Sequence, residues 1–579
     1  MRGGDQELLR VGNCSGFYGD RLSAMREMLE GGDLDVLTGD WLAELTMLIL
    51  GRDRLGDPDT GYAKTFLLQL RDCLGLALEQ NVTIVANAGG VNTPGLVTAI
   101  RELASEQGLS PKVAHVRGDD LTPRAAELDL GQPMGAHAYL GGFGIARAVA
   151  SGADIVVTGR VTDASVIVGP AIAHFGWGRE DLDALAGATA AGHVIECGTQ
   201  ATGGNYAFFT EIDTFSHLGF PIAEIARDGS SVITKHPGTG GAVTVDTVKS
   251  QLLYEIADAR YPGPDVTTRL DTITLAQDGP DRVSMSGIRG EAPPPQLKVS
   301  LNSLGGFRNE MTMVLTGLDI EAKAELVQRQ FEEELTTSPA ELTWTLARTD
   351  RPDAPTQQQA AALLTVVARD SDPKVVGRAF SRAGIEIALG TYPGCHTLAP
   401  PSAGSPYGVF TPGYVSQATP VHEVVLDDGS IEAVTPPQQT QPLEPLTGEP
   451  ATSGDADLGT TDTTTAPLGS IAGARSGDKG GHANVGVWVR DEAAWPWLSA
   501  LLTPERVRQL LPEAEDLPIT VTHLPNLLAV NIVIHDLLGR GVAYNARFDP
   551  QAKGLGEWLR SRHVNIPTHL LPSTPKESR

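Results

Sequence analysis

Charged and hydroxyl side chains follow directly after a strongly apolar segment in the first third of the chain. The sequence GADIVVTGRVTDAS, residues 152–165, changes from three β-branched residues to Arg160, Asp163 and Ser165. A guanidinium group can hold a substrate carboxylate or phosphate through two parallel hydrogen bonds, and a neighbouring carboxylate can act as a general base. The alternative is an internal arginine–aspartate pair that only fixes the loop, and the sequence favours neither interpretation.

Four other short apolar segments change in the same way to polar or glycine residues. They are LLRVGNCSG, LDVLTGDW, TIVANAGGVN and KVAHVRGDD. The polar and glycine residues at their ends are Asn13, Ser15, Asp40, Glu44, Asn87, Gly89, Gly90, Asn92, Asp119 and Asp120. Any single Asp, Asn or Ser side chain among them could instead cap a helix, because these residue types are favoured at helix starts.

The segments between these apolar runs have helical spacing. In residues 60–81, for example, apolar residues recur at intervals of three or four, namely Phe66, Leu67, Leu70, Leu74 and Leu78. Alternation of short strands and helices predicts an α/β domain with a parallel sheet, either doubly wound or barrel-like. In such folds ligands bind at the carboxyl ends of the strands, which meet at one edge. We therefore expect the five polar strand ends to surround one ligand site.

Acidic residues at three strand ends are candidate ligands of a divalent metal, namely Asp40, Glu44 and Asp119. No HxH or HExxH pair accompanies them, so the sequence leaves the use of a metal cofactor open. A thiol nucleophile is a less favoured alternative. The segment GHVIECG places His193 near Cys197, yet cysteine is more often an inert buried residue.

Two glycine-rich segments could present successive backbone N–H groups to an anion. ATGGNY, residues 201–206, contains Gly203, Gly204 and Asn205, and KHPGTGG begins with Lys235 and His236. Such segments suit a phosphate or a carboxylate. Neither matches the phosphate-binding pattern GxxxxGK[ST], however, and glycine pairs are more often plain turns.

A third glycine-rich segment, SGDKGGHAN, combines charge, an imidazole and an amide at residues 476–484. Asp478, Lys479 and His482 are its candidate substrate-binding residues, and three residues on later segments could gather around them, namely Asn526, Asn531 and His535. The alternative is a surface hairpin with good turn residues.

The composition indicates a large globular protein of 579 residues with 41% hydrophobic content. Its formal charge of -27 argues against a nucleic-acid partner, because phosphate binding needs clustered Lys and Arg.

Four scattered cysteines without a CxxC support neither a zinc finger nor a disulfide framework. No signal-like segment and no run of about 20 apolar residues is present, so we expect a cytoplasmic protein without a membrane partner. Large enzymes of this kind are often symmetric homo-oligomers.

The order of patterns predicts four parts. Residues 8–290 are expected to form the α/β domain, and residues 291–432 an α+β unit that follows it or is inserted in it. Residues 433–468 contain no Lys, Arg or aromatic residue and are expected to form a flexible, disordered linker. Residues 469–572 are expected to form a ferredoxin-like α+β domain.

Several of these motifs, taken in order, resemble the acyclic terpene utilisation (AtuA) family. They are GNCSGFYGDR, LTGDWLAELTM, NAGGVN, YLGGFGI, GADIVVTGRVTDAS, GHVIECGTQATGGN and QLLYEI, across residues 8–425. The segment from residue 469 resembles the small ferredoxin-fold domain that some members carry fused. The resemblance implies bacterial breakdown of geraniol and citronellol, with cleavage of 3-hydroxy-3-isohexenylglutaryl-CoA to acetate or its CoA ester.

Such a lyase would cleave a branched acyl-CoA by a retro-aldol reaction, which needs a base for the hydroxyl proton and an electrophile for the enolate. Asp163, Asp40 or His193 could be the base, and a divalent metal or Arg160 with loop amides could be the electrophile. The glycine-rich loops could hold the CoA phosphates or the free carboxylate. An acyl-CoA hydratase or hydrolase and a non-catalytic scaffold are the alternatives, and the five polar strand ends argue against a pure scaffold.

Overall fold

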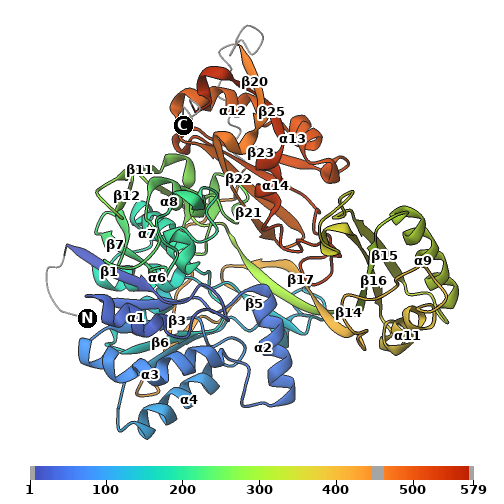
Figure 1. Ribbon diagram of the computed structural model, residues 1–579. Coiled ribbons are helices and arrows are strands. Elements are labelled where there is room, and N and C mark those ends of the chain that lie inside the picture. The colour runs from blue at the N-terminus through green and yellow to red at the C-terminus, as the bar shows by residue number, and fades with distance from the viewer. Residues whose placement is uncertain (1–6, 445–461, 573–579) are drawn as a thin grey trace. The chain divides into compact units, whose positions relative to one another are not determined.

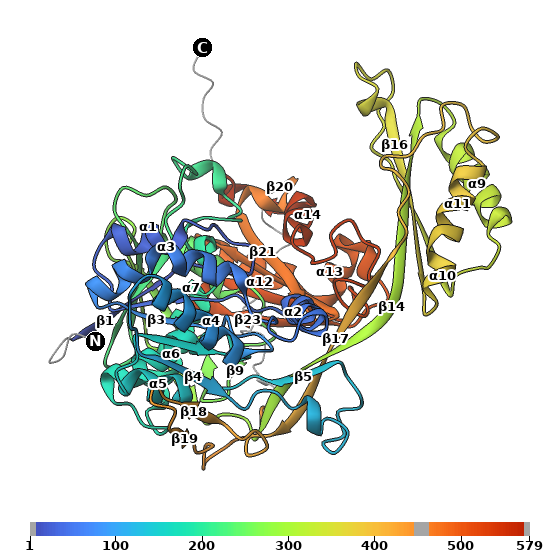
Figure 2. The ribbon, with the colours of Figure 1, turned by 90° about the horizontal axis from the view of Figure 1, so that it is seen from below.

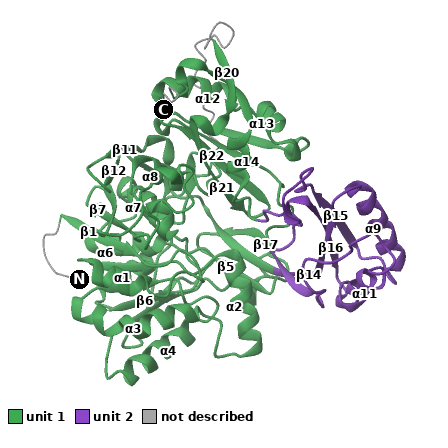
Figure 3. Cartoon of the chain, viewed as in Figure 1, with its two compact units in different colours: residues 1–302, 410–542, 551–579 green, residues 303–409, 543–550 purple. Residues whose placement is uncertain are grey.

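The computed structural model describes residues 7–444 and 462–572. The chain divides into two compact units, which Figure 3 shows in different colours. Unit 1 comprises residues 1–302, 410–542 and 551–579, and unit 2 comprises residues 303–409 and 543–550. No helix in the described part of the chain is long and apolar enough to cross a membrane.

Five parallel strands form the centre of a large sheet in unit 1, and Figure 1 shows part of this sheet. They are β1 (Leu8–Asn13), β2 (Val36–Gly39), β3 (Thr83–Ala86), β4 (Val113–Arg117) and β6 (Ile155–Thr158). The strands pair in the order β1-β2-β3-β6-β4, so β6 lies between β3 and β4 although it follows both in the chain. Each strand coincides with one of the five apolar segments of the sequence, and the predicted parallel sheet is confirmed.

Helices cover both faces of this sheet. One face carries α1 (Ala24–Gly31), α3 (Lys64–Gln80) and α4 (Thr93–Glu106), and the other carries α5 (Phe143–Ala150), α6 (Ser165–Phe175) and α7 (Leu182–Ile195). Side chains alternate between the faces, so Ile155 and Val157 pack with the first set of helices and Val156 packs with the second. The strand order has two ends in the described residues, which makes the arrangement doubly wound rather than barrel-like.

Antiparallel strands extend the sheet at both edges. Beyond β1 follow β7 (Pro221–Ala226), β8 (Ser231–Lys235), β12 (Val283–Ser286) and β11 (Thr274–Gln277), and beyond β4 follow β18 (Glu423–Val425) and β19 (Ile431–Ala433). Figure 2 shows β18 beside β4. The sequence pattern places β18 in the smaller α+β unit, but Val424 is fully buried and pairs with Val116 of the large sheet.

Other elements of the first part of the chain complete unit 1. They are α2 (Glu44–Gly56), β5 (Gly135–Ala138), α8 (Val245–Leu252), and a small sheet of β9 (Arg260–Pro262), β10 (Thr267–Arg269) and β13 (Arg289–Glu291). Strand β5 stands apart from the large sheet because it pairs with β14 (Gln296–Thr316) at residues 299–302.

Unit 2 contains a four-stranded sheet with the order β15-β16-β14-β17. Its elements are the later residues of β14, α9 (Ile320–Glu334), β15 (Glu341–Ala347), β16 (Ala361–Asp370), α10 (Pro373–Val376), α11 (Arg378–Glu386) and the first residues of β17 (Ser405–Ser416). Phe331 of α9 and Phe380 of α11 are fully buried, with ring centroids 5.2 Å apart. The unit therefore has an apolar core of its own.

The C-terminal domain, residues 462–542 and 551–572, contains a four-stranded antiparallel sheet with the order β21-β22-β24-β23. Its elements are β20 (Thr463–Pro467), β21 (Ala472–Lys479), β22 (His482–Val489), α12 (Trp495–Leu501), α13 (Pro504–Leu510), β23 (Ile519–Leu524), β24 (Ala529–Ile534), α14 (Leu555–Ser561) and β25 (His563–Pro567). Residues 445–461 of the predicted linker lie outside the described residues. Its last residues are not a linker, because β20 pairs with β25.

One face of the β21–β24 sheet packs against the rest of unit 1. Trp488 of β22 is fully buried in the apolar core that also contains residues of α7 and α8. A Cβ atom at Gly477 would lie 2.4 Å from the ring of Tyr254, and one at Gly486 would lie 2.4 Å from Leu253. These two glycines therefore let the sheet approach the chain that follows α8.

Candidate active site

Arg160 lies at the centre of the polar residues that follow the strands. Its Nη1 donates to the carbonyl oxygen of Leu42 and to Oδ1 of Asp163, both at 2.9 Å. The guanidinium carbon is 4.3 Å from the ring centroid of Tyr139, which is cation–π geometry. The backbone N–H of Arg160 donates to Asp119 at 2.8 Å. The Arg160–Asp163 pair expected from the sequence is therefore present and is tied to the ends of β2 and β4.

Asp40 and Asn87, which follow β2 and β3, are joined by a side-chain hydrogen bond. The Asn87 carbonyl also accepts from the N–H of Trp41 at 2.7 Å. Burial and the negative charge of Asp163 raise the pKa of Asp40, although Arg160 opposes them. Burial likewise raises the pKa of Asp163 against the opposing charge of Arg160. Both carboxyl groups therefore keep a proton to higher pH than an ordinary aspartate does.

The pairing of β5 with β14 adds a tyrosine and a lysine that sequence reasoning missed: Tyr139 directly follows β5, and Lys298 lies in β14. The N–H of Tyr139 donates to the carbonyl oxygen of Lys298, because β5 and β14 pair there. The Tyr139 hydroxyl donates to Glu44 at 2.9 Å, and Nζ of Lys298 lies 3.7 Å from the same carboxylate. Burial alone would raise the pKa of Glu44, but Lys298 and Arg160 outweigh it and lower the pKa to about 2. Glu44 is therefore ionised at neutral pH.

The end of helix α7 reaches the same place. Nδ2 of Asn13 donates to the carbonyl oxygens of Ile195 and Glu196, which fixes the last turn of the helix. His193 Nδ1 and Glu196 Oε1 are hydrogen-bonded at 3.1 Å, and both side chains are buried. Burial, reinforced by Lys479, lowers the pKa of His193 to about 4. Burial and the charge of Asp163 raise the pKa of Glu196 well above its usual value.

Cys197 is not an activated thiol. His193 bonds to Glu196 and not to the cysteine. Burial, with the added negative charge of Glu196, raises the pKa of the Cys197 thiol well above its ordinary value. A thiol that keeps its proton is a poor nucleophile.

The C-terminal domain contributes a lysine to this region. Nζ of Lys479, at the end of β21, donates to the carbonyl oxygen of Glu255 at 2.7 Å. Asn484 of β22 accepts from the N–H of Glu255 at 2.8 Å, so two contacts hold the same residue. Burial and the charge of Glu255 raise the pKa of Asp478 to about 7. The segment SGDKGGHAN is therefore more than a surface hairpin, because it packs against the chain after α8.

We refer to these side chains together as the strand-end cluster. Its members are Asp40, Glu44, Asn87, Tyr139, Arg160, Asp163, His193, Glu196, Glu255, Lys298 and Lys479. Arg160 and His193 are buried. In contrast, 34% of the side-chain surface of Glu44, 33% of that of Asp163 and 37% of that of Lys298 is exposed. A ligand can reach the exposed members, while the buried members set their position and charge.

Two predicted binding residues, Asn92 and Ser165, are hydrogen-bonded to groups of the protein near them. Oδ1 of Asn92 accepts from the N–H of Gly95 and thereby caps α4, while its Nδ2 donates to the carbonyl oxygen of Thr60. The hydroxyl of Ser165 is 2.5 Å from that of Thr162 at the start of α6. Asn92 therefore caps a helix, the alternative that its residue type allowed, whereas Ser165 is bonded to a neighbouring side chain.

The segment ATGGNY does not form an anion cradle. The N–H of Gly203 donates to the carbonyl oxygen of Gln200, and the N–H of Gly204 donates to that of Thr199. The carbonyl oxygen of Asn205 faces a guanidinium of the C-terminal domain at 3.5 Å. Both glycine N–H groups thus donate to carbonyl oxygens within a local turn, so neither is left to donate to a phosphate.

The basic side chains of KHPGTGG, Lys235 and His236, also form hydrogen bonds within the protein. Nζ of Lys235 donates to the carbonyl oxygen of Thr239 at 2.8 Å and is 3.0 Å from the carboxylate of Asp281. Nε2 of His236 is hydrogen-bonded to the carbonyl oxygen of Met28 at 3.0 Å. These contacts close the loop and fasten it to α1.

The side chain of His482 contacts residues of its own C-terminal domain. Its Nδ1 accepts from the N–H of Asp536 at 3.0 Å, and its ring lies 5.1 Å from that of His535. Of the three candidates in SGDKGGHAN, Lys479 therefore joins the strand-end cluster, and His482 does not.

The three candidate metal ligands, Asp40, Glu44 and Asp119, are not gathered around one point. Each carboxylate accepts a hydrogen bond from a different neighbour. Within residues 7–444 and 462–572, no group of three His, Cys, Asp or Glu side chains is placed to hold a metal ion. The residues present therefore do not fit the hypothesis of a divalent metal at this position.

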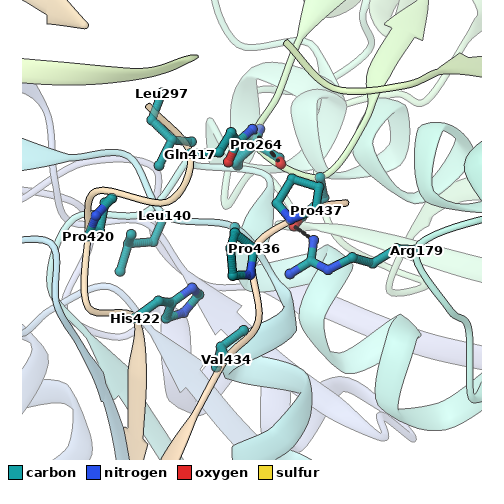
Figure 4. A pocket seen from close by; sticks show the side chains of 12 residues that line it. Leu140, Arg179, Pro264, Leu297, Gln417, Pro420, His422, Val434, Pro436 and Pro437 are labelled. Carbon is teal, nitrogen blue, oxygen red and sulfur yellow. Dashed lines mark hydrogen bonds and ion pairs between the residues drawn. The ribbon is translucent and has the colours of Figure 1, made fainter. Parts of the chain in front are cut away.

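Two cavities in unit 1 lie away from the cluster. The smaller has a volume of about 30 Å³ and is bordered by Leu140, Arg179, Gln417 and His422 among others (Figure 4). It has room for about one water molecule. The larger, of about 860 Å³, lies between the start of α7 and the β7–β8 and β12–β13 turns. No member of the strand-end cluster lines either cavity.

Comparison with known protein families agrees with the motifs and the fold. The model of the acyclic terpene utilisation family protein AtuA matches residues 9–426, which is more than half of the chain. The chain belongs to the AtuA family. A second model, the AtuA ferredoxin-like domain, matches residues 466–565. The AtuA region holds every member of the strand-end cluster except Lys479, which the ferredoxin-like region contributes. No curated protein and no solved structure matches the chain.

Proposed function

We propose that this AtuA family member is a carbon–carbon lyase that cleaves a branched 3-hydroxyglutaryl-CoA-like thioester by a retro-aldol reaction. Membership of a family of acyclic terpene utilisation supports the choice of a branched substrate. The observation that supports this reaction type is the environment of Asp163. Asp163 has a partly exposed carboxyl group with a raised pKa, and it lies within the electrostatic reach of Lys298 and Lys479.

Asp163 is suited to remove the proton of a tertiary hydroxyl group. Arg160 holds its Oδ1, and its other carboxyl oxygen has no hydrogen-bond partner among the described residues. Burial raises the pKa of Asp163 against the opposing charge of Arg160, and a carboxylate with a raised pKa is a stronger base. As the hydroxyl proton passes to Asp163, the alcohol carbon becomes a carbonyl.

The bond that breaks joins this alcohol carbon to the two-carbon fragment that leaves. Its electron pair moves onto the fragment as the enolate of acetate or of acetyl-CoA. Where the fragment is acetate, the oxygens of its enolate are those of the free carboxylate of the substrate, and Lys298 and Lys479 are the cations proposed to stabilise them. The enolate carbon finally takes up the proton held by Asp163, so atoms and charge balance without an oxidant or a reductant.

The test is incubation of the full-length protein with branched 3-hydroxyacyl-CoA and 3-hydroxyglutaryl-CoA esters, with and without EDTA. Mass spectrometry should detect acetate or acetyl-CoA together with the matching 3-oxo product. We expect turnover to persist in EDTA, because the cluster supplies its own cations. Loss of turnover in EDTA would instead assign the electrophile to a metal ion.

The same experiment separates the alternative functions of the site. A product that has gained or lost water with its carbon chain intact would identify a hydratase, and free CoA with an intact acid would identify a hydrolase. Binding of an ester without any chemical change would favour a non-catalytic scaffold. Each of these outcomes would overturn the lyase proposal.

A further inference from the structure

We infer that Lys298 and Lys479 together bind the free carboxylate of a dicarboxylic substrate, so that the C-terminal domain completes the binding site. The inference deepens the proposed function, because a glutaryl thioester carries such a carboxylate at the end opposite the CoA. It rests on the placement of two lysines from distant parts of the chain and on the donors that these lysines have left.

Lys298 is held at the exposed side of the cluster by an aromatic pair. Its Nζ lies 4.7 Å from the ring centroid of Tyr139 and 5.1 Å from that of Phe410. The nearest carboxylate oxygen, from Glu44, is 3.7 Å away and already accepts the Tyr139 hydroxyl. The ammonium group is thus positioned by rings and is paired only loosely with an acid.

Lys479 reaches the same place from the hairpin between β21 and β22. Gly480, the next residue, has a φ of 65°, and a Cβ atom there would meet the Phe410 ring at 3.4 Å. The ring of Phe410 therefore lies against the hairpin and also against Lys298. The left-handed backbone favours glycine, which explains the residue after the lysine.

The ammonium group of Lys479 keeps donors for a ligand. Its single hydrogen bond in the described residues goes to the carbonyl oxygen of Glu255, and an ammonium group has three donors. The carboxylates that face it are Glu255, Glu44 and Asp163. Burial and the like charge of Lys298 outweigh them, since the pKa of Lys479 is lowered overall. The two ammonium groups thus lie within electrostatic reach of each other, and one carboxylate bound between them would accept hydrogen bonds from both.

The neighbouring acids select a carboxylate over a phosphate. Glu44 is ionised, and Asp163 and Glu255 lie nearby, so a single group that carries two negative charges, as hydrogen phosphate does, meets more repulsion between the lysines than one carboxylate does. A carboxylate carries one charge and two acceptor oxygens, one for each lysine. Inorganic phosphate is therefore the discriminating competitor.

The experiment is calorimetric titration of the full-length protein with 3-hydroxy-3-methylglutarate, which lacks a thioester. We expect Lys479→Met and Lys298→Met each to weaken binding about tenfold to a hundredfold, the usual effect of losing one charge-assisted hydrogen bond. Lys479→Arg should restore most of the affinity. Phosphate should bind much more weakly than the diacid.

The matched control is Lys249→Met, since Lys249 is also buried near the domain contact but pairs with Asp246 at 3.8 Å. It should bind the diacid as the unaltered protein does, and circular dichroism should show that all variants are folded. Unchanged binding by a folded Lys479→Met variant would overturn the inference, as would failure of the unaltered protein to bind the diacid.

Binding and turnover fail separately in this design. If the diacid binds through both lysines but no thioester is cleaved, the carboxylate site stands and the lyase proposal falls. If thioesters are cleaved and KM is unchanged in Lys479→Met, the lyase proposal stands and the carboxylate site falls.

Discussion

The strand-end cluster and the two glycine-rich loops at residues 201–206 and 235–241 differ in what their polar groups have left to offer. In the loops, the amides of Gly203 and Gly204 close a turn, and Lys235 is bonded to Thr239 and Asp281. In the cluster, Asp163 keeps a carboxyl oxygen without a partner in the described residues. A ligand site is therefore marked by polar groups that keep an unused hydrogen-bonding position, and not by a high content of glycine or charge.

In the cluster, several buried titratable groups also act on one another. Burial raises the pKa of Asp40, Asp163 and Glu196 and lowers that of His193 to about 4. Perturbed pKa values that arise from burial together with specific charged neighbours are typical of catalytic sites. If this contrast is functional, changes in the cluster should affect turnover and stability far more than changes in the loops.

The largest effect is expected from Asp163→Asn. The amide keeps the shape of the side chain and can still accept from Arg160, but it cannot take a proton. Turnover of the cleaved thioester should fall about 10²–10⁴-fold, the usual contribution of a general base. The control is Asp281→Asn, which alters the partner of Lys235 in the loop region and should leave turnover unchanged. Full activity of Asp163→Asn would assign the base to another residue.

Arg160→Met tests the buried centre of the cluster. Loss of the guanidinium leaves the carbonyl oxygen of Leu42 and the carboxylate of Asp163 without their donor. The free energy of unfolding, measured by urea denaturation, should fall by about 3 kcal/mol. The double variant Arg160→Met/Asp163→Asn should recover part of the loss, because no unpaired charge remains. Equal stability of the single and double variants would show that the ion pair is not coupled.

Asp119→Asn should change how stability depends on pH. Burial raises the pKa of Asp119 to about 7, whereas an unfolded aspartate titrates near pH ~4. Between these values the folded protein binds a proton that the unfolded chain does not, so the contribution of Asp119 to stability falls as pH rises. The amide that replaces this carboxyl group cannot ionise. The stability of the variant relative to the unaltered protein should thus increase from about pH 4 to about pH 7 in urea denaturation, and a constant difference would contradict the assignment.

The smallest effect is expected in the loops. Lys235→Met removes the contacts to Thr239 and to the half-exposed Asp281, which should lower the free energy of unfolding by about 1 kcal/mol. Because this lysine lies outside the strand-end cluster, kcat and KM should not change. A rise in KM would restore the loop as a substrate-binding element.

Much of the fold could be predicted, because the features that specify it are local. The five apolar segments and the helical spacing between them correspond to β1, β2, β3, β4, β6 and the intervening helices. Strand ends in a parallel sheet meet by geometry alone, and this brought Asp40, Asn87 and Arg160 to one place. The position of β6 between β3 and β4 could not be predicted, since pairing order leaves no local pattern.

The parts of the site that escaped prediction depend on contacts between distant segments. Tyr139 and Lys298 meet only because β5 pairs with β14, and Glu255 meets Lys479 only because the C-terminal domain packs there. The turn bonds of Gly203 and Gly204 are local, but a glycine pair in a closed turn and one in an anion cradle have the same sequence. Composition could not distinguish them.

The burial of Trp488 in the central apolar core has a consequence for how the chain folds in time. Leu252 and Leu253, which share that core, are synthesised more than 200 residues before Trp488 covers them. At ribosomal rates of roughly 5–20 residues per second, Trp488 is synthesised about 10–50 seconds after these two leucines. During this interval the nascent chain exposes an apolar face to the cell, so its yield in vivo should depend on the chaperones that shield it until synthesis ends.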